Sequence, residues 1–386
     1  MSLIALLLGR PLANREAETR KIGVFEAVPA MGLDGLGSAS YGPEAMLTVL
    51  AAAGAAGLGA VQPTTWAIIA LLAMLCFSYW QTIAAYPTNG GSYTVARENL
   101  GTEAGLLAAA ALMLDYMLNV AVGISAGVGA LVSAFPALQP FILPLCLTIL
   151  VTITLVNLRG TKESGVAFAV PTYTFITTLL VVLGLGVWAA WTQGGRPQPV
   201  IPPPSATDMA GPVTLWLILR AFAAGCTAMT GVEAVSNGVG AFKDPAVKYA
   251  HRTLAVICIV LGVLLLGIAY LARAYGIEAM DQTAPGYQSV ISQLVGAVWG
   301  RGWLYWLTIG SVLAVLCLSA NTSFVGFPRL CRMVASDGYL PKAFALPGRR
   351  LVYTAGVLFL AGGAGGLLLV FGGITDRLIP LFAIGA

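Results

Sequence analysis

Three acidic residues, Asp34, Asp115 and Glu233, lie within long apolar stretches of the sequence. A charged side chain in a bilayer interior costs at least about 2.5 kcal/mol, so such residues normally face the protein interior and serve a function. Tyr41 follows Asp34 in one glycine-rich run, and Thr230 precedes Glu233 in a second. Carboxylate and hydroxyl oxygens suit a small cation better than an anion. The sequence therefore predicts a binding site for a small cation.

The stretch around Asp115 adds two further candidates. Asn119 falls one helical turn after Asp115 and on the same face, and Tyr116 is adjacent. We expect this face to line the same cavity. Neighbouring carboxylates disfavour each other's ionisation, so we predict that Glu233 or Asp115 also carries a proton. The alternative is that these groups only hydrogen-bond neighbouring helices, as polar groups in membranes often do.

Other kinds of chemistry find no support in the sequence. Six cysteines and one histidine, His251, show no metal-ligand spacing. We found no nucleophile motif or phosphate-binding loop, so we predict neither an enzyme nor a cofactor. The basic residues are scattered among short loops, which argues against a nucleic-acid partner.

Composition places these candidates in a membrane. Charged residues make up 9% of the 386 residues and apolar types 58%, whereas soluble domains are about 25% charged. Stretches of about 20 apolar residues can cross a bilayer. We predict an all-α polytopic membrane protein surrounded by lipid, with a tenth span that begins near Leu378 and is incomplete at Ala386, as expected for a fragment of a longer protein. The other nine predicted spans cover residues 24–54, 64–86, 103–132, 138–157, 166–191, 213–239, 253–275, 290–325 and 351–371.

The basic residues predict the orientation. With a cytoplasmic N-terminus, most of the 20 Lys and Arg residues fall in cytoplasmic loops, as the positive-inside rule requires. We therefore expect a multi-pass protein of the cell (inner) membrane. Arg220 lies within a span but about 20 Å of helix from Glu233, too far to neutralise it. In this orientation the basic residues on the outer side of the membrane are Arg196, Arg273, Arg301 and Arg377.

Two spans are interrupted in the same way. Residues 31–44 read MGLDGLGSASYGPE and residues 225–240 read GCTAMTGVEAVSNGVG. Irregular backbone at this depth persists only where protein encloses it or where it lines a cavity. Each break is followed by a similar motif, GSYTVARENLG at 91–101 and GYQSVISQLVG at 286–296. Five spans per half would invert the second copy, which predicts an inverted repeat with broken spans 1 and 6.

This repeat predicts four segments. Residues 1–23 form a cytoplasmic N-terminal segment, and residues 24–191 form the first repeat with spans 1–5. An external Pro-rich loop covers residues 192–212. Residues 213–386 form the second repeat, spans 6–10.

Four motifs resemble the amino acid, polyamine and organocation transporter superfamily: GLDGLGSASYGPEAM, YPTNGGSYTVARENLG, AMTGVEAVSNGV and RLCRMVASDGYLP. The first three are similar to those of its Kup and KimA type potassium uptake permeases, and the resemblance runs from about Leu8 to the end of the chain. It implies a LeuT-like 5+5 fold and proton-driven potassium (K⁺) import by alternating access. Relatives continue into two further spans and a cytoplasmic domain, so the resemblance also implies a homodimer formed through the missing C-terminal region.

By motif position, the resemblance implies K⁺ contacts for Asp34, Tyr41, Asp115, Thr230 and Glu233. The chain departs from the family in other places. Asn119 and Gly123 stand where relatives can carry hydroxyls, and Phe382 stands where relatives can carry tyrosine.

Two alternatives stay open. An amino acid or amine permease would bind a substrate carboxylate at a half-helix N-terminus and the amine at Glu233 or Asp34. A cation channel would pass ions down their gradient without a proton.

Overall fold

The computed structural model describes residues 21–87, 91–159, 165–204, 211–346 and 353–385, so most of the predicted N-terminal segment lies outside them. Within these residues the chain is helical, with one isolated bridge between Ile22 and Phe242. Eight of the described helical segments are long and apolar enough to cross a membrane. The all-α polytopic fold is therefore confirmed.

The first predicted span is broken into three short helices, α2 (Val24–Met31), α3 (Leu33–Ser38) and α4 (Gly42–Leu50). Glycines at 32, 35 and 37 weaken helix in this stretch. Pro43 lies in the first turn of α4, where its missing N–H costs nothing.

The second break separates α10 (Leu215–Cys226) from the short helix α11 (Ala234–Asn237). Between them a 3₁₀ turn leads to Thr230, which is extended, and to Gly231 with φ +85°. A Cβ at Gly231 would lie 2.4 Å from the Cβ atom of Asp34. Only glycine therefore allows the two breaks to touch here.

The repeated motifs form short helices before the long ones. In the first half, α6 (Ser92–Leu100) ends at Gly101, with φ +96°, and α7 (Thr102–Ala134) follows. In the second half, α13 (Val290–Trp299) ends at Gly300, with φ +80°, and α14 (Trp303–Ser336) follows. The single span predicted at 290–325 is therefore wrong in its bounds, because a glycine turn divides it.

The remaining helices complete the bundle. Helix α5 begins at Ala55, nine residues before the start of the span predicted at 64–86. The division of the chain into two repeats that meet at residues 191 and 213 stays a prediction. These helices are α5 (Ala55–Ala85), α8 (Ile142–Leu158), α9 (Gly165–Thr192), α12 (Ala246–Tyr275), α15 (Thr354–Phe371) and α16 (Thr375–Gly385).

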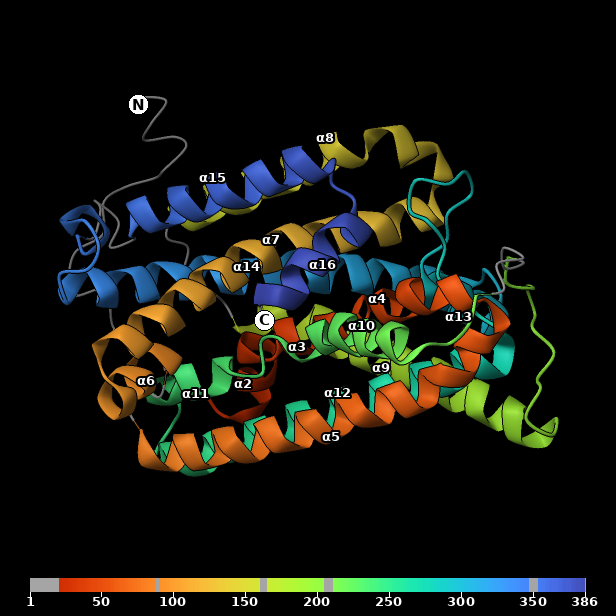
Figure 1. The fold of residues 1–386 in the computed structure, drawn as a ribbon, viewed down its shortest axis with the longest axis horizontal. Helices are drawn as coiled ribbons and strands as arrows, with labels where there is room; N and C mark the ends of the chain where they lie inside the picture. Colours follow the sequence, from red (N-terminus) through yellow and green to blue (C-terminus); the bar gives the residue numbers. More distant parts are fainter. Residues whose placement is uncertain (1–20, 88–90, 160–164, 205–210, 347–352, 386) are drawn as a thin grey trace.

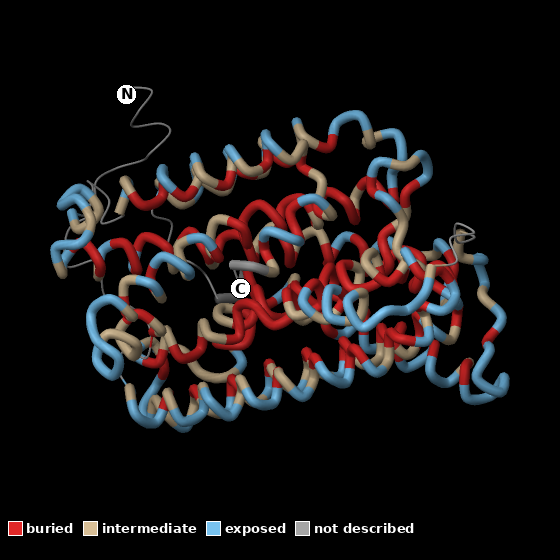
Figure 2. Tube along the Cα trace, in the orientation of Figure 1, coloured by how far each residue is buried: buried red, intermediate tan, exposed pale blue. Residues whose placement is uncertain are grey.

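Figure 1 shows α5 beside α12 along one side of the molecule and α8 beside α15 along the other, with α7, α14 and the broken helices between them. We call the two ends of the bundle the α6 end and the α13 end. Buried residues concentrate in the middle layer, whereas the outer helices expose apolar side chains such as Phe77 and Val370 (Figure 2). An apolar outer surface is what contact with lipid requires.

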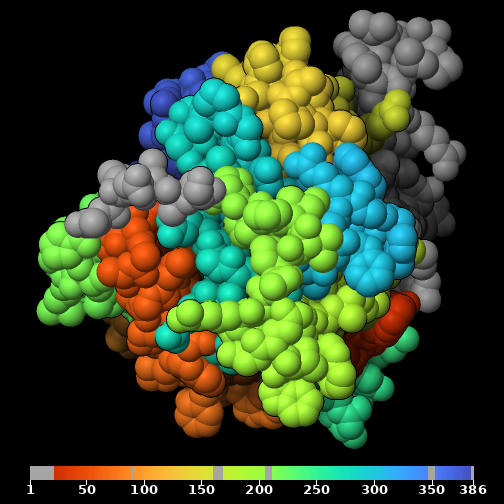
Figure 3. Space-filling model, turned by 90° about the vertical axis from the view of Figure 1, so that its right-hand side faces the viewer, coloured from red at the N-terminus to blue at the C-terminus, as the bar shows by residue number. Residues whose placement is uncertain are grey.

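Close packing of α7 on α14 holds the middle layer together. A Cβ at Gly123 would lie 3.3 Å from the carbonyl oxygen of Leu316, and one at Gly127 would lie 3.4 Å from the Leu316 Cβ atom. This small-xxx-small pair permits the close approach. At the α13 end, the chain after α9 lies over α13 (Figure 3), where Val200 N–H donates to the Ala297 carbonyl at 2.8 Å.

Candidate ion-binding site

The carboxylate of Asp34 is buried in the first break and is held from two other helices. Its Oδ2 accepts a hydrogen bond from Asn119 Nδ2 on α7 at 2.9 Å. Its Oδ1 accepts one from Ser319 Oγ on α14 at 3.2 Å. The first break is thus joined to both long helices of the middle layer through one carboxylate.

Asp115 and Asn119 present free oxygens to the interior. Asp115 is 7% exposed and Asn119 is 1% exposed. Among the described residues, neither Asp115 Oδ1 nor Asn119 Oδ1 has a hydrogen-bond partner. Burying a polar atom without a partner is costly. Two such oxygens one turn apart on α7 are suited to bind a cation.

Glu233 brings a third carboxylate from the second break. Glu233 interacts electrostatically with both Asp34 and Asp115, and Asp34 interacts electrostatically with Asp115. In the part of the chain that the structure describes, no basic side chain forms an ion pair with these carboxylates. Arg220 is exposed on α10. The site therefore gathers three carboxyl groups that have no basic partner among the described residues.

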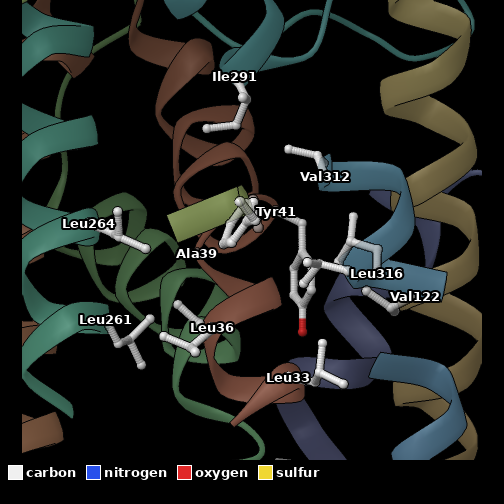
Figure 4. Packing of buried hydrophobic residues seen from close by; sticks show 14 of the residues in the cluster. Leu33, Leu36, Ala39, Tyr41, Val122, Leu261, Leu264, Ile291, Val312 and Leu316 are labelled. Atoms are coloured by element: carbon white, nitrogen blue, oxygen red, sulfur yellow. The ribbon is translucent and has the colours of Figure 1, made fainter. Parts of the chain in front are cut away.

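Tyr41 and Thr230 connect the two breaks. The Tyr41 hydroxyl lies 3.4 Å from Thr230 Oγ1. Because Thr230 Oγ1 itself donates to the Thr227 carbonyl at 3.0 Å, Tyr41 is the donor. In Figure 4 the Tyr41 ring lies among apolar side chains, and its hydroxyl points toward Leu33 and away from Ile291. Ser38 Oγ adds a link to the Ala228 carbonyl at 2.5 Å.

Tyr116 and Phe382 also lie beside the site. The Tyr116 hydroxyl lies against Gly326 of α14, and its place among the ion-binding residues stays a prediction. Phe382 is fully buried, with its ring centroid 6.4 Å from that of Tyr41.

Sequence reasoning missed Ser319 and Ser323, two buried hydroxyls on α14. Ser319 donates to Asp34, and Ser323 Oγ accepts from Asn119 Nδ2 at 2.9 Å. The run SANTS at 319–323 inside an apolar span is the signal that could have found them. A similar amide contact, Asn157 Nδ2 to Asn321 Oδ1 at 2.6 Å, lies on the same run.

A further carboxylate, that of Glu44, lies beside the site and joins α4 to α13. It accepts from the Tyr287 hydroxyl at 2.8 Å and from Val290 N–H, in the first turn of α13, at 3.4 Å. The cavity next to Tyr41 is lined by Glu44, Tyr287 and Asp376. These contacts agree with the structural role expected of a carboxylate at a helix start.

Eight membrane-length helical segments among the described residues, two touching breaks and the polar groups gathered at those breaks are typical of a membrane protein of the inverted-repeat transporter fold. The amino acid permease family model matches residues 36–386, and the chain belongs to this family.

Two relatives of known name show the range of the family. The potassium transporter KimA of Bacillus subtilis (strain 168) is 41% identical over 385 residues, which covers all of this chain and 62% of that protein. The low-affinity putrescine importer PlaP of Escherichia coli (strain K12) is 23% identical over 286 residues, 73% of this chain and 61% of that protein. The chain thus spans less than two thirds of the length of either relative.

Proposed function

We propose that this chain forms the membrane part of a transporter that takes up potassium together with protons by alternating access. The observation that carries the proposal is the group of three carboxylates, Asp34 and Glu233 at the two breaks and Asp115 on α7, which have no basic partner among the described residues. Hard oxygen ligands of this kind favour a small cation. The 41% identity to a protein named a potassium transporter supports K⁺ as that cation.

In the proposed cycle, K⁺ exchanges its water for oxygens of Asp34, Asp115, Tyr41 and Thr230. Glu233 or Asp115 takes the coupled proton, because a proton relieves the repulsion among neighbouring carboxylates. The breaks allow the half-helices to tilt separately, so the site can open to one side of the membrane at a time. We place the α6 end and the N-terminus in the cytoplasm of a cell-membrane protein, because the basic loops gather there.

A diamine importer is the second candidate, and one observation favours it. The relative PlaP is named a putrescine importer, and a diamine could pair its ammonium groups with the same carboxylates. An amino acid fits less well, because its carboxylate would meet Asp34 in the first break.

Competition against rubidium uptake tests these candidates. The full-length protein is reconstituted into vesicles, and uptake of labelled rubidium is measured in the presence of excess potassium, sodium, putrescine or a mixture of amino acids. The proposal predicts that potassium alone competes strongly. Strong competition by putrescine would indicate that a diamine, not potassium, is the substrate. The absence of rubidium uptake would overturn the proposal.

A further inference from the structure

Among the described residues, Ser323 is hydrogen-bonded to the site through Asn119. Ser319 and Ser323 are one turn apart on α14 and are 2% and 0% exposed. Ser319 bonds to Asp34 directly, whereas Ser323 Oγ meets Asn119 Nδ2 at 2.9 Å. The same Nδ2 atom donates to Asp34 Oδ2 at 2.9 Å.

This arrangement fixes which way the Asn119 amide faces. An asparagine Nδ2 carries two hydrogens, and here one goes to Asp34 and the other to Ser323. Rotating the amide by 180° would set its oxygen against the Asp34 carboxylate, two acceptors facing each other. The Asn119 Oδ1 atom therefore stays on the side without a partner, on the same helix face as the Asp115 Oδ1 atom.

We propose that Ser323 is a positioning residue for cation binding, which holds the Asn119 amide so that Oδ1 serves as an ion ligand beside Asp115. This inference rests on the proposed function, because it concerns the same site. Ser323 gives the Asn119 Nδ2 group a second acceptor beside the Asp34 carboxylate. When an ion engages the ionised Asp34, the bond from Asn119 to Asp34 weakens, and the bond to Ser323 then holds the amide in its plane.

Loss of the hydroxyl frees the amide to rotate and to present N–H groups to the cation. A net hydrogen bond is worth about a three- to tenfold change in an equilibrium constant. We expect S323A to raise the KM for rubidium by about that factor and to change the maximal rate by less than twofold. S323T keeps a hydroxyl and restores the KM.

A double-mutant cycle separates positioning from packing. In an N119A background, S323A should leave the KM within about twofold of N119A alone, because nothing remains to orient. N119S replaces N119A if the alanine variant fails to insert. The matched control is S311A on the same helix, because the buried Ser311 hydroxyl donates to the Thr308 carbonyl at 2.8 Å. This variant should keep the wild-type KM.

Additive effects of S323A and N119A would overturn the positioning role, as would a wild-type KM in S323A. A lowered melting temperature with an unchanged KM would reduce Ser323 to packing. Thermal stabilisation of the purified wild type by potassium tests potassium binding separately from the role of Ser323. If potassium does not stabilise the wild type, the proposed function and the role of Ser323 are both refuted. If potassium stabilises the wild type and S323A equally, only the positioning role of Ser323 is refuted.

Discussion

Replacing Asp115 by asparagine removes one negative charge from the site and keeps the size of the side chain. Asp115 is buried and its Oδ1 has no hydrogen-bond partner among the described residues. A unit charge about 4 Å from a cation contributes about 4 kcal/mol at an effective dielectric constant of 20. Without Asp115, Asp34 and Glu233 ionise more readily, and their stronger attraction for the cation offsets roughly half of this. The remaining ~2 kcal/mol corresponds to about a thirtyfold weaker Kd for potassium.

Potassium binding to purified D115N is measured by calorimetry, and rubidium uptake is measured in proteoliposomes at a concentration near the wild-type Kd. We expect the thirtyfold loss in binding and, at this concentration, uptake that is about fifteenfold lower. D281N is the matched control, because Asp281 lies in an outer loop and accepts hydrogen bonds from Thr283. It should bind and transport as the wild type does. A D115N protein with wild-type Kd and uptake would refute the assignment of Asp115 to the site.

Three further predictions concern the surroundings of the site. G231A should abolish uptake, since its Cβ would lie 2.7 Å from Asp34 Oδ2 and displace the carboxylate; normal uptake would contradict the contact between the breaks. Y41F should raise the KM for rubidium about threefold through loss of one hydroxyl ligand, and an unchanged KM would remove Tyr41 from the ligands. At the α6 end, hydrogen bonding from Tyr93 and the charge of Arg97 lower the pKa of Asp337. Asp337 therefore stabilises the fold above the ordinary aspartate pKa of about 3.9 and loses this effect as the pH falls through its lowered value. D337N should lower the melting temperature by about 2 °C at pH 7 and by less at pH 3; an equal difference at both pH values would contradict this.

The two breaks were predictable because glycine and hydroxyl residues at mid-span cannot make good lipid-exposed helix. The same local signal placed Asp34 and Glu233 in them. The division of residues 290–325 into two helices was predictable as well, because Gly300, Arg301 and Gly302 interrupt the apolar pattern. The predicted span was too long because it ran through this charged residue and the glycine turn at Gly300.

The side chains that complete the site depend on tertiary packing. Serine inside a helix commonly bonds its own backbone, so the run SANTS marks Ser319 and Ser323 as unusual in an apolar span but does not say that they bond to Asp34 and Asn119. Asn119 was found because it lies one turn from Asp115. Tyr116 is one residue further along the helix than Asp115, which rotates it by about 100° and brings its hydroxyl against Gly326 of α14.

The central claim is that protons drive potassium through this site. We would reconstitute the full-length protein and measure rubidium uptake with and without an inward proton gradient, at equal membrane potential. The proposal predicts that the gradient stimulates uptake severalfold and that rubidium added outside draws protons into the vesicles. Rubidium flux at the same rate with and without the gradient, with no proton movement, would contradict it and favour a channel.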